Sequence, residues 1–351
     1  MTLTTVAGQI AAETLRPGSP TVQWPPVPDL AGALVLGVLR QIEAANTLPA
    51  DTLAARQQDQ LERLTDFAHK STQHYRNVLA QAARGKVNRS DFWSFWRTIP
   101  TVSTADLNKN RLRFTAGKLP KQHGAVTAHR VGMPDGSTLR LKTTPIPDLI
   151  EKTIQITMMR ACGWEFDGKL AMSGDAKIAS PRISPHWGMP FKTGPMLRMP
   201  ADASAAVWRE RLGAFRPDYL VLPASKFALL RPLLEGADRP DGLKEVLVVG
   251  AASHEITEVD GLRVRRFVTL TGVGAIAAER PDGGEYQLQP AATLCELLAA
   301  GGEPVAPGVA GRLVVTPLHN FAMPILRLDL GITATQTSAP GAPGPATIAF
   351  S

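Results

Sequence analysis

Helical and strand patterns alternate between Asp218 and Leu270 and in the residues just before. The pattern has two amphipathic helical segments and three short apolar or alternating runs, in the order VWRERLGAF, DYLVLP, SKFALLRPLLEG, EVLVVG and RVRRFVTL. Strands that are separated by helices need crossover connections, which are typical of parallel pairing in a sheet with helices packed on it. This part of the chain therefore predicts an α/β fold with some parallel strands.

The chain on either side has a different character. The first residues are rich in proline and small residues, with one short helical pattern around Leu30–Ala44. From Asp51 apolar residues recur at helical spacing, which predicts a helical N-terminal part. After Arg113 short strands and loops follow, and the last part is β-rich. We expect an N-terminal arm over 1–50, one domain over 51–335 and a disordered Pro/Gly-rich tail over 336–351.

Composition argues against several function classes. The 351 residues include only two cysteines, Cys162 and Cys295, which give no disulfide framework and no zinc spacing and favour a reducing, cytoplasmic setting. The longest apolar run, LAGALVLGVL, is too short to cross a bilayer, and no secretory signal pattern is present, so we expect no membrane partner. The sequence has no Gly-x-Ser-x-Gly elbow and only a weak imitation of a dinucleotide fingerprint, in TGVGAIA.

The net charge favours an anionic partner. Lysine and arginine number 38 against 31 acidic residues, which gives +7. The densest basic stretches are KVNRSDFWSFWR and LNKNRLRFTAGKLPK, and neither matches a nucleic-acid-binding motif, so we expect no nucleic-acid partner. A solvated basic surface and a specific anion site both remain open for these residues.

Four segments together resemble one family, the adenylate-forming enzymes, in the branch of the phenylacetate–coenzyme A ligases. They are QLERLTDFAHKSTQHYRNVL, WRTIPTVSTADLNKN, LKEVLVVGAASHE with VTLTGVGAIAAE, and GEPVAPGVAGRLVVTPLHNFAMPILRLDLG. The resemblance covers Asp51 to about Ile332. It implies the α/β fold of the family's large N-terminal domain, with a helical N-terminal part, mixed sheets and a β-rich C-terminal part. The family's small C-terminal domain, which carries a catalytic lysine, is expected to be absent.

The family's phosphate-binding loop is matched by HRVGMPDGSTLRLKTT, His129–Thr144. In the family, backbone N–H groups and hydroxyls of this loop hold the ATP phosphates. Here Met133, Pro134 and Asp135 stand where small hydroxyl and glycine residues belong. Pro134 has no N–H to donate, and the carboxylate of Asp135 repels phosphate. The resemblance therefore implies a poor phosphate site.

Two further nucleotide-binding segments are altered. The family's Tyr-Gly-x-Thr-Glu segment, whose tyrosine stacks on adenine and whose glutamate binds magnesium, matches Val268 at the tyrosine, Thr271 at the threonine and Gly272 at the glutamate. The family's ribose-binding aspartate matches Ile332, whose side chain cannot accept hydrogen bonds. We expect ATP and magnesium binding to be lost, with no cofactor and no metal site.

An acyl pocket can remain in a protein of this family that no longer binds ATP. SPRISPHWGMPFKTGPML resembles the family's acyl-gating segment, which makes His186 a candidate general base and Trp187 a substrate-binding residue. The remaining candidates are catalytic His319 and Arg327 and substrate-binding His129, His254, Thr271 and Asp329. Each also has a structural interpretation: His186 as a packing or hydrogen-bonding loop residue, His319 as a turn residue, and Arg327 with Asp329 as a structural pair.

Three functions follow from this resemblance. The first is an ATP-independent enzyme of a biosynthetic pathway, in the manner of secondary metabolism, which acts on an acyl or aryl substrate by cyclisation, condensation or acyl transfer. Its basic surface suits an acidic acyl carrier protein as partner. The second is a non-catalytic partner that stabilises or positions another pathway enzyme. The third is a true acyl- or aryl-CoA ligase completed by a C-terminal domain on another chain. The family often forms dimers, so a homodimer is also expected.

Overall fold

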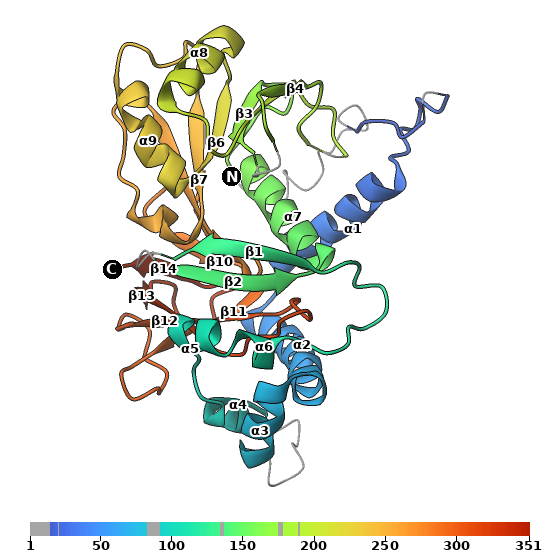
Figure 1. Cartoon of the computed structure of the whole chain (residues 1–351), viewed down its shortest axis with the longest axis vertical. Helices are drawn as coiled ribbons and strands as arrows, with labels where there is room; N and C mark the ends of the chain where they lie inside the picture. The colour runs from blue at the N-terminus through green and yellow to red at the C-terminus, as the bar shows by residue number, and fades with distance from the viewer. Residues whose placement is uncertain (1–14, 20, 83–91, 134–136, 175–177, 189) are drawn as a thin grey trace. The chain divides into compact units, whose positions relative to one another are not determined.

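The computed structural model describes residues 15–19, 21–82, 92–133, 137–174, 178–188 and 190–351 (Figure 1). The chain forms two compact units, each built from two stretches of sequence. The first unit contains residues 1–41 and 156–266, and the second contains 42–155 and 267–351. Three elements run from one unit into the other, namely α1 (Leu30–Ala45), α7 (Pro145–Ala161) and β8 (Arg263–Leu270). The helix expected around Leu30–Ala44 is confirmed by α1.

The first unit contains the expected α/β layer. Its strands run in the order β7 (Glu245–Val249), β6 (Tyr219–Pro223), β3 (Leu170–Ser173), β5 (Met196–Met199) and β4 (Arg182–Ser184). The pairs β7·β6, β6·β3 and β3·β5 are parallel, and β4 is antiparallel to β5. The helices are α8 (Ala205–Phe215) and α9 (Ala224–Glu235), with the short 3-10 turn η4 (Ala251–Glu255) after β7. Parallel pairing is therefore confirmed.

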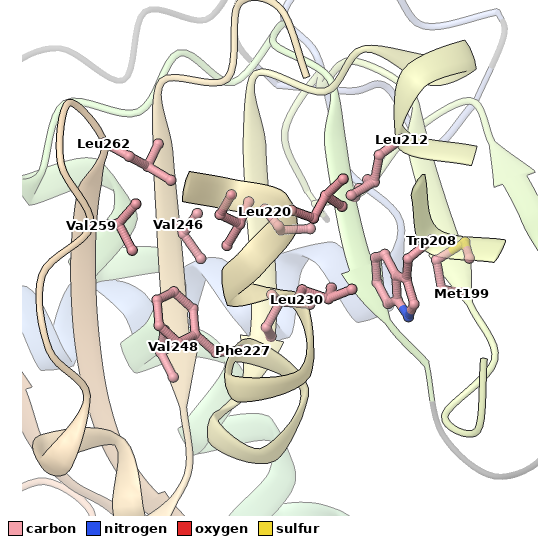
Figure 2. Close-up of a cluster of buried hydrophobic side chains, with 14 of the residues drawn as sticks. Met199, Trp208, Leu212, Leu220, Phe227, Leu230, Val246, Val248, Val259 and Leu262 are labelled. Carbon is pink, nitrogen blue, oxygen red and sulfur yellow. The ribbon is translucent and has the colours of Figure 1, made fainter. Parts of the chain in front are cut away.

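The core of this unit explains why the two helices pack on the sheet. Trp208 of α8 and Phe227 of α9 have 0% and 1% exposure, and Figure 2 shows Trp208 beside Met199 of β5 and Phe227 beside Val248 of β7. Ser204 caps α8, where its hydroxyl accepts a hydrogen bond from the Val207 N–H. Burying these large side chains provides the main driving force for this layer.

The second unit joins a helical part to an antiparallel sheet. Its helices are α2 (Ala50–Ser71), α3 (Gln73–Ala82), α4 (Phe92–Thr98), α5 (Thr104–Lys109) and α6 (Arg111–Phe114). The hairpin of β1 (Thr127–Gly132) and β2 (Thr138–Thr143) forms a separate two-stranded sheet. The remaining strands are β9 (Gly274–Glu279), β10 (Tyr286–Leu288), β11 (Thr293–Leu298), β12 (Ala310–Pro317), β13 (Leu328–Gln336) and β14 (Thr347–Phe350), in the order β11-β12-β13-β14-β10-β9-β8.

The prediction of a disordered tail over 336–351 is wrong. Strand β14 pairs with β10 and β13, and Ile348 has 1% exposure. The Gly344 N–H donates to the Leu48 carbonyl oxygen at 2.9 Å. The Pro/Gly-rich composition of the loop before β14 concealed a short apolar alternation, TIAF, that completes the sheet.

Candidate functional site

The residues that sequence comparison suggested for the site divide between the two units, and each group is described by itself. The first unit contains His186, Trp187 and His254. The second contains His129, Thr271, His319, Arg327 and Asp329. The phosphate-loop residues Pro134, Asp135 and Gly136 lie outside the described residues.

In the first unit, Thr193 organises the loop that carries His186 and Trp187. The Trp187 N–H donates to the Thr193 hydroxyl at 2.7 Å, and Trp187 Nε1 donates to the Gly168 carbonyl at 3.0 Å. His186 Nδ1 lies 3.0 Å from the Thr193 carbonyl oxygen. Because a carbonyl only accepts, Nδ1 carries the proton and Nε2 carries the lone pair. The half-buried imidazole is thus held in the tautomer that a general base needs, and the same bond also serves loop packing.

His254 lies on η4, and its Nε2 is 3.8 Å from the Glu255 carboxylate. That carboxylate is exposed, so the contact is a weak one.

In the second unit, Asn320 connects three segments. Its Nδ2 donates to the Gly272 carbonyl at 2.7 Å and to the Lys142 carbonyl at 3.0 Å, and its Oδ1 accepts from the Met323 N–H at 3.2 Å. Asn320 has 0% exposure. One buried amide therefore fixes the turn between β8 and β9 to the end of β2, and both carbonyls would lose their partner without it.

The turn between β8 and β9 is packed against β2. Gly272 has φ +86°, and a Cβ built on it would lie 3.1 Å from Leu141 Cβ. Leu141 has 1% exposure, and Thr271 beside the turn is half-buried. His129 of β1 is paired with Leu141 in the hairpin register, and its buried Nε2 has no hydrogen-bond partner among the described residues. The space next to Gly272 is thus occupied by an apolar side chain.

His319 lies next to Asn320 and is a neutral imidazole at neutral pH. Its Nε2 donates to the Ala291 carbonyl at 2.8 Å. Burial lowers the pKa of His319, and the neighbouring His123 lowers that pKa further. A lowered pKa makes the ring a weaker base, so the structure gives His319 a turn-stabilising contact and leaves its catalytic role a prediction.

Arg327 and Asp329 do not form the structural pair that the sequence suggested. Arg327 has φ +59°, which turns its side chain away from the following strand. Its guanidinium instead donates from Nε to Glu296 at 3.2 Å and from Nη1 to the Ile99 carbonyl at 2.6 Å. Asp329 pairs with Arg312. Both residues therefore have internal structural partners.

Comparison with solved structures shows which proteins share this fold. A 2-hydroxyisobutyryl-CoA ligase, in complex with 2-HIB-AMP and CoA, superimposes with a TM-score of 0.63 at 16% identity, covering 87% of this chain and 70% of that one. The same ligase in its postadenylation state gives 0.64 at 15% identity, covering 87% of this chain and 68% of that one. The acyl acid amido synthetase AtGH3.15 gives 0.56 at 14% identity, covering 92% of this chain and 71% of that one.

The fold is that of the adenylate-forming enzymes. No protein-family model and no curated protein sequence matches the chain. The family resemblance suggested by the sequence motifs is thus supported at the level of the fold, across both units of the chain.

Glu151 is a further candidate residue that sequence reasoning missed. It lies on α7, and burial raises its pKa to about 7, while hydrogen bonding with the Thr269 side chain lowers that pKa in part. Thr269 belongs to β8, just before the turn at Thr271 and Gly272. A carboxyl group with a pKa near 7 can both give and take a proton at neutral pH. The sequence carried no clear signal for it, because Glu151 is one of several charged residues in DLIEKTIQITMMRACG.

The described residues offer little to a metal ion. In the part of the chain that the structure describes, no three His, Cys, Asp or Glu side chains come together in a metal-binding group. No helix in the described ranges is long and apolar enough to span a bilayer. Gly272 has no side chain to offer as a ligand on the adenylate-forming fold, and Leu141 occupies the space beside it.

Proposed function

We propose that this protein acts on an acyl or aryl substrate in a biosynthetic pathway, in the manner of secondary metabolism, without forming an adenylate. The observation that carries the proposal is the packing of Leu141 against Gly272. In the family that the sequence resembles, a glutamate at this position binds magnesium. Here the backbone is left-handed and a Cβ would already be 3.1 Å from Leu141, so the position does not fit a carboxylate that reaches a metal.

The other nucleotide-binding positions support the same proposal. Val268 stands at the position of the family's adenine-stacking tyrosine and has 0% exposure within β8. Ile332 stands at the position of the ribose-binding aspartate and has 4% exposure within β13. Both side chains are apolar and packed into the fold. The residues at these positions therefore do not fit ATP.

The fold's neighbours support the substrate class. The 2-hydroxyisobutyryl-CoA ligase is named for an acyl group and was captured with its acyl adenylate, and AtGH3.15 is named as an acyl acid amido synthetase. We infer an acyl or aryl group as the substrate of this chain too, presented as a thioester or other activated form because no adenylate would be made. An acyl group that arrives already activated needs no ATP for cyclisation, condensation or acyl transfer.

Two residues are suited to move protons in such a reaction. In the second unit, burial raises the pKa of Glu151 to about 7. In the first unit, the His186 imidazole is oriented by the hydrogen bond between Nδ1 and the Thr193 carbonyl. Removing a proton next to a thioester carbonyl, or from an attacking hydroxyl or amine, is work that a carboxylate or an imidazole can perform.

A ligand panel without nucleotide tests the proposal. We expect at least one acyl or aryl acid, or its pantetheine thioester, to raise the melting temperature by about 2–4 °C with neither ATP nor magnesium present. Glu151→Gln should remove the inflection near pH 7 from the rate of any turnover found, whereas Asp148→Asn on the same helix should keep an inflection and move it to lower pH, because the Asp148 charge raises the pKa of Glu151.

The other outcomes identify the other functions. Acyl ligands that bind only together with Mg-ATP would contradict the proposal and favour a ligase completed by a domain on another chain. If no acyl or aryl compound binds, with or without nucleotide, the result would contradict the proposal and favour a non-catalytic partner of a pathway enzyme.

A further inference from the structure

A basic groove lies in the second unit between α5–α6 and the β1–β2 hairpin. It encloses a volume of about 690 Å³. Its cations are Lys109, Arg111 and Arg113 from the helical side and Arg130 and Arg140 from the hairpin. Figure 1 shows α5 and α6 beside β2, and the Asn108 side chain joins them by donating to the Thr138 carbonyl at 2.8 Å. The two walls of the groove are therefore fixed to each other.

The five cations of the groove have no ion-pair partner among the residues that the structure describes. Asp106 is the acid nearest in sequence to the three cations of the helical side, and its carboxylate accepts from the Ser103 hydroxyl at the start of α5. Arg130 and Arg140 are also directly opposite each other in the hairpin register. Like charges at opposed positions destabilise a hairpin, so the fold itself does not call for this arrangement.

An exposed apolar residue lies among these charges. Leu112 lines the groove between Arg111 and Arg113, and 75% of its surface is exposed. Solvation of a basic surface does not account for an exposed leucine between two arginines. An apolar contact with a charged rim is instead the usual composition of a protein–protein interface.

The groove fits an acidic protein better than a free phosphate ligand. Phosphate sites hold their anion with fixed backbone N–H groups or bidentate arginines. Here Lys109, Arg113, Arg130 and Arg140 are exposed and each lies on a different element, and the Leu112 side chain has no hydrogen-bond donor for a phosphate. A broad acidic surface with a small apolar spot complements all of these features at once.

We propose that this groove, the α5–α6/hairpin groove, is the docking surface for a small acidic carrier protein. The choice of a carrier protein rests on the proposed function, because an activated acyl or aryl group must reach this chain on some carrier. Docking would use the five cations for encounter and orientation and Leu112 for the desolvated centre of the contact. The acyl group itself stays thioester-linked to the carrier in this step, and no bond is made or broken.

Charge reversal with a matched control tests the docking surface. The probe is a holo-acyl carrier protein of net negative charge, with poly-L-glutamate as a second acidic polypeptide, titrated calorimetrically at low salt. We expect Arg130→Glu/Arg140→Glu to raise the dissociation constant at least about tenfold. The control Arg56→Glu/Arg63→Glu, on the exposed face of α2, also changes the net charge from +7 to +3. We expect this control to change the dissociation constant less than about twofold. Leu112→Ser should weaken binding of the carrier protein more than it weakens binding of poly-L-glutamate.

Several results would overturn the inference. Equal weakening by both double variants would mean that only net charge attracts the probe. Absence of binding by both acidic probes would also contradict it, as would saturable binding of coenzyme A that Arg130→Glu/Arg140→Glu abolishes while the carrier protein fails to bind. The experiment measures binding alone. Binding of the carrier protein without any acyl turnover would therefore support the docking surface and contradict only the proposed function.

Discussion

Replacing Arg327 by methionine is expected to lower the free energy of unfolding by about 3–5 kcal/mol, the usual cost of breaking a buried ion pair on one side. Arg327 has 3% exposure, and its Nε donates to Glu296 at 3.2 Å. Its Nη1 donates to the carbonyls of Ile99 at 2.6 Å and Arg97 at 3.1 Å. The variant leaves all three acceptors without this donor.

Glu296 makes the effect depend on pH. Burial raises the pKa of Glu296, and Arg327 beside it is the main influence that lowers that pKa. Without the guanidinium this pKa rises further, so the folded variant binds a proton that the unfolded chain releases at its ordinary pKa of 4.5. Below that ordinary pKa both states are protonated and the penalty is smallest. It grows as the pH rises toward the folded pKa, and the loss of stability is therefore larger at pH 7 than at pH 4.

Denaturant unfolding at both pH values measures this prediction, with Arg312→Met as the control. Arg312 pairs with Asp329, but its side chain is 38% exposed, so its loss should cost less than about 1 kcal/mol. Trp96 reports on the network, since its Nε1 donates to Glu296 at 3.1 Å. A cost below about 1 kcal/mol for Arg327→Met, unchanged with pH, would contradict the structural role assigned to this arginine.

Placing a glutamate at position 272 is expected to destabilise the protein by about 2–5 kcal/mol without creating magnesium binding. The left-handed backbone at φ +86° costs an L side chain about 1–2 kcal/mol. The new Cβ at 3.1 Å from Leu141 adds overpacking of about 1–3 kcal/mol. Isothermal titration with magnesium and thermal unfolding of Gly272→Glu measure the two parts of the prediction.

Two further variants separate the causes. Gly301→Glu adds the same side chain where nothing lies within 4 Å, and it should be close to neutral. Adding Gly272→Glu to a Leu141→Ala protein should cost less than adding it to the original protein, because Leu141 Cδ1 at 3.2 Å is gone, while the Cβ contact at 3.1 Å and the backbone strain stay. A Gly272→Glu protein as stable as the original, and able to bind magnesium with ATP, would show that the packing of this turn does not prevent the family's metal site.

The sequence predicted the fold because its strongest patterns are local. The alternation before β8 requires crossovers, and it appears as parallel β3, β5, β6 and β7 with α8 and α9. The family motifs led to the adenylate-forming fold, which the solved structures share. Strand β14 was missed because a four-residue strand after a Pro/Gly-rich loop gains its stability from β10 and β13, which are remote in sequence.

The site was harder to predict because its chemistry depends on burial and backbone direction. Glu151 is one acid among many in the sequence, and only its burial beside Thr269 raises its pKa to about 7. Arg327 and Asp329 are two residues apart, but the positive φ of Arg327 sends their side chains to different partners. The contact of Gly272 with Leu141 joins segments far apart in the chain, which no local pattern reveals.

Titration calorimetry with Mg-ATP at millimolar concentrations tests the loss of adenylation most directly. The packing at Gly272 and the apolar residues Val268 and Ile332 predict no saturable heat and no rise in melting temperature. Clear saturable binding, with a matching rise in melting temperature, would contradict the account and return this chain to the ligases.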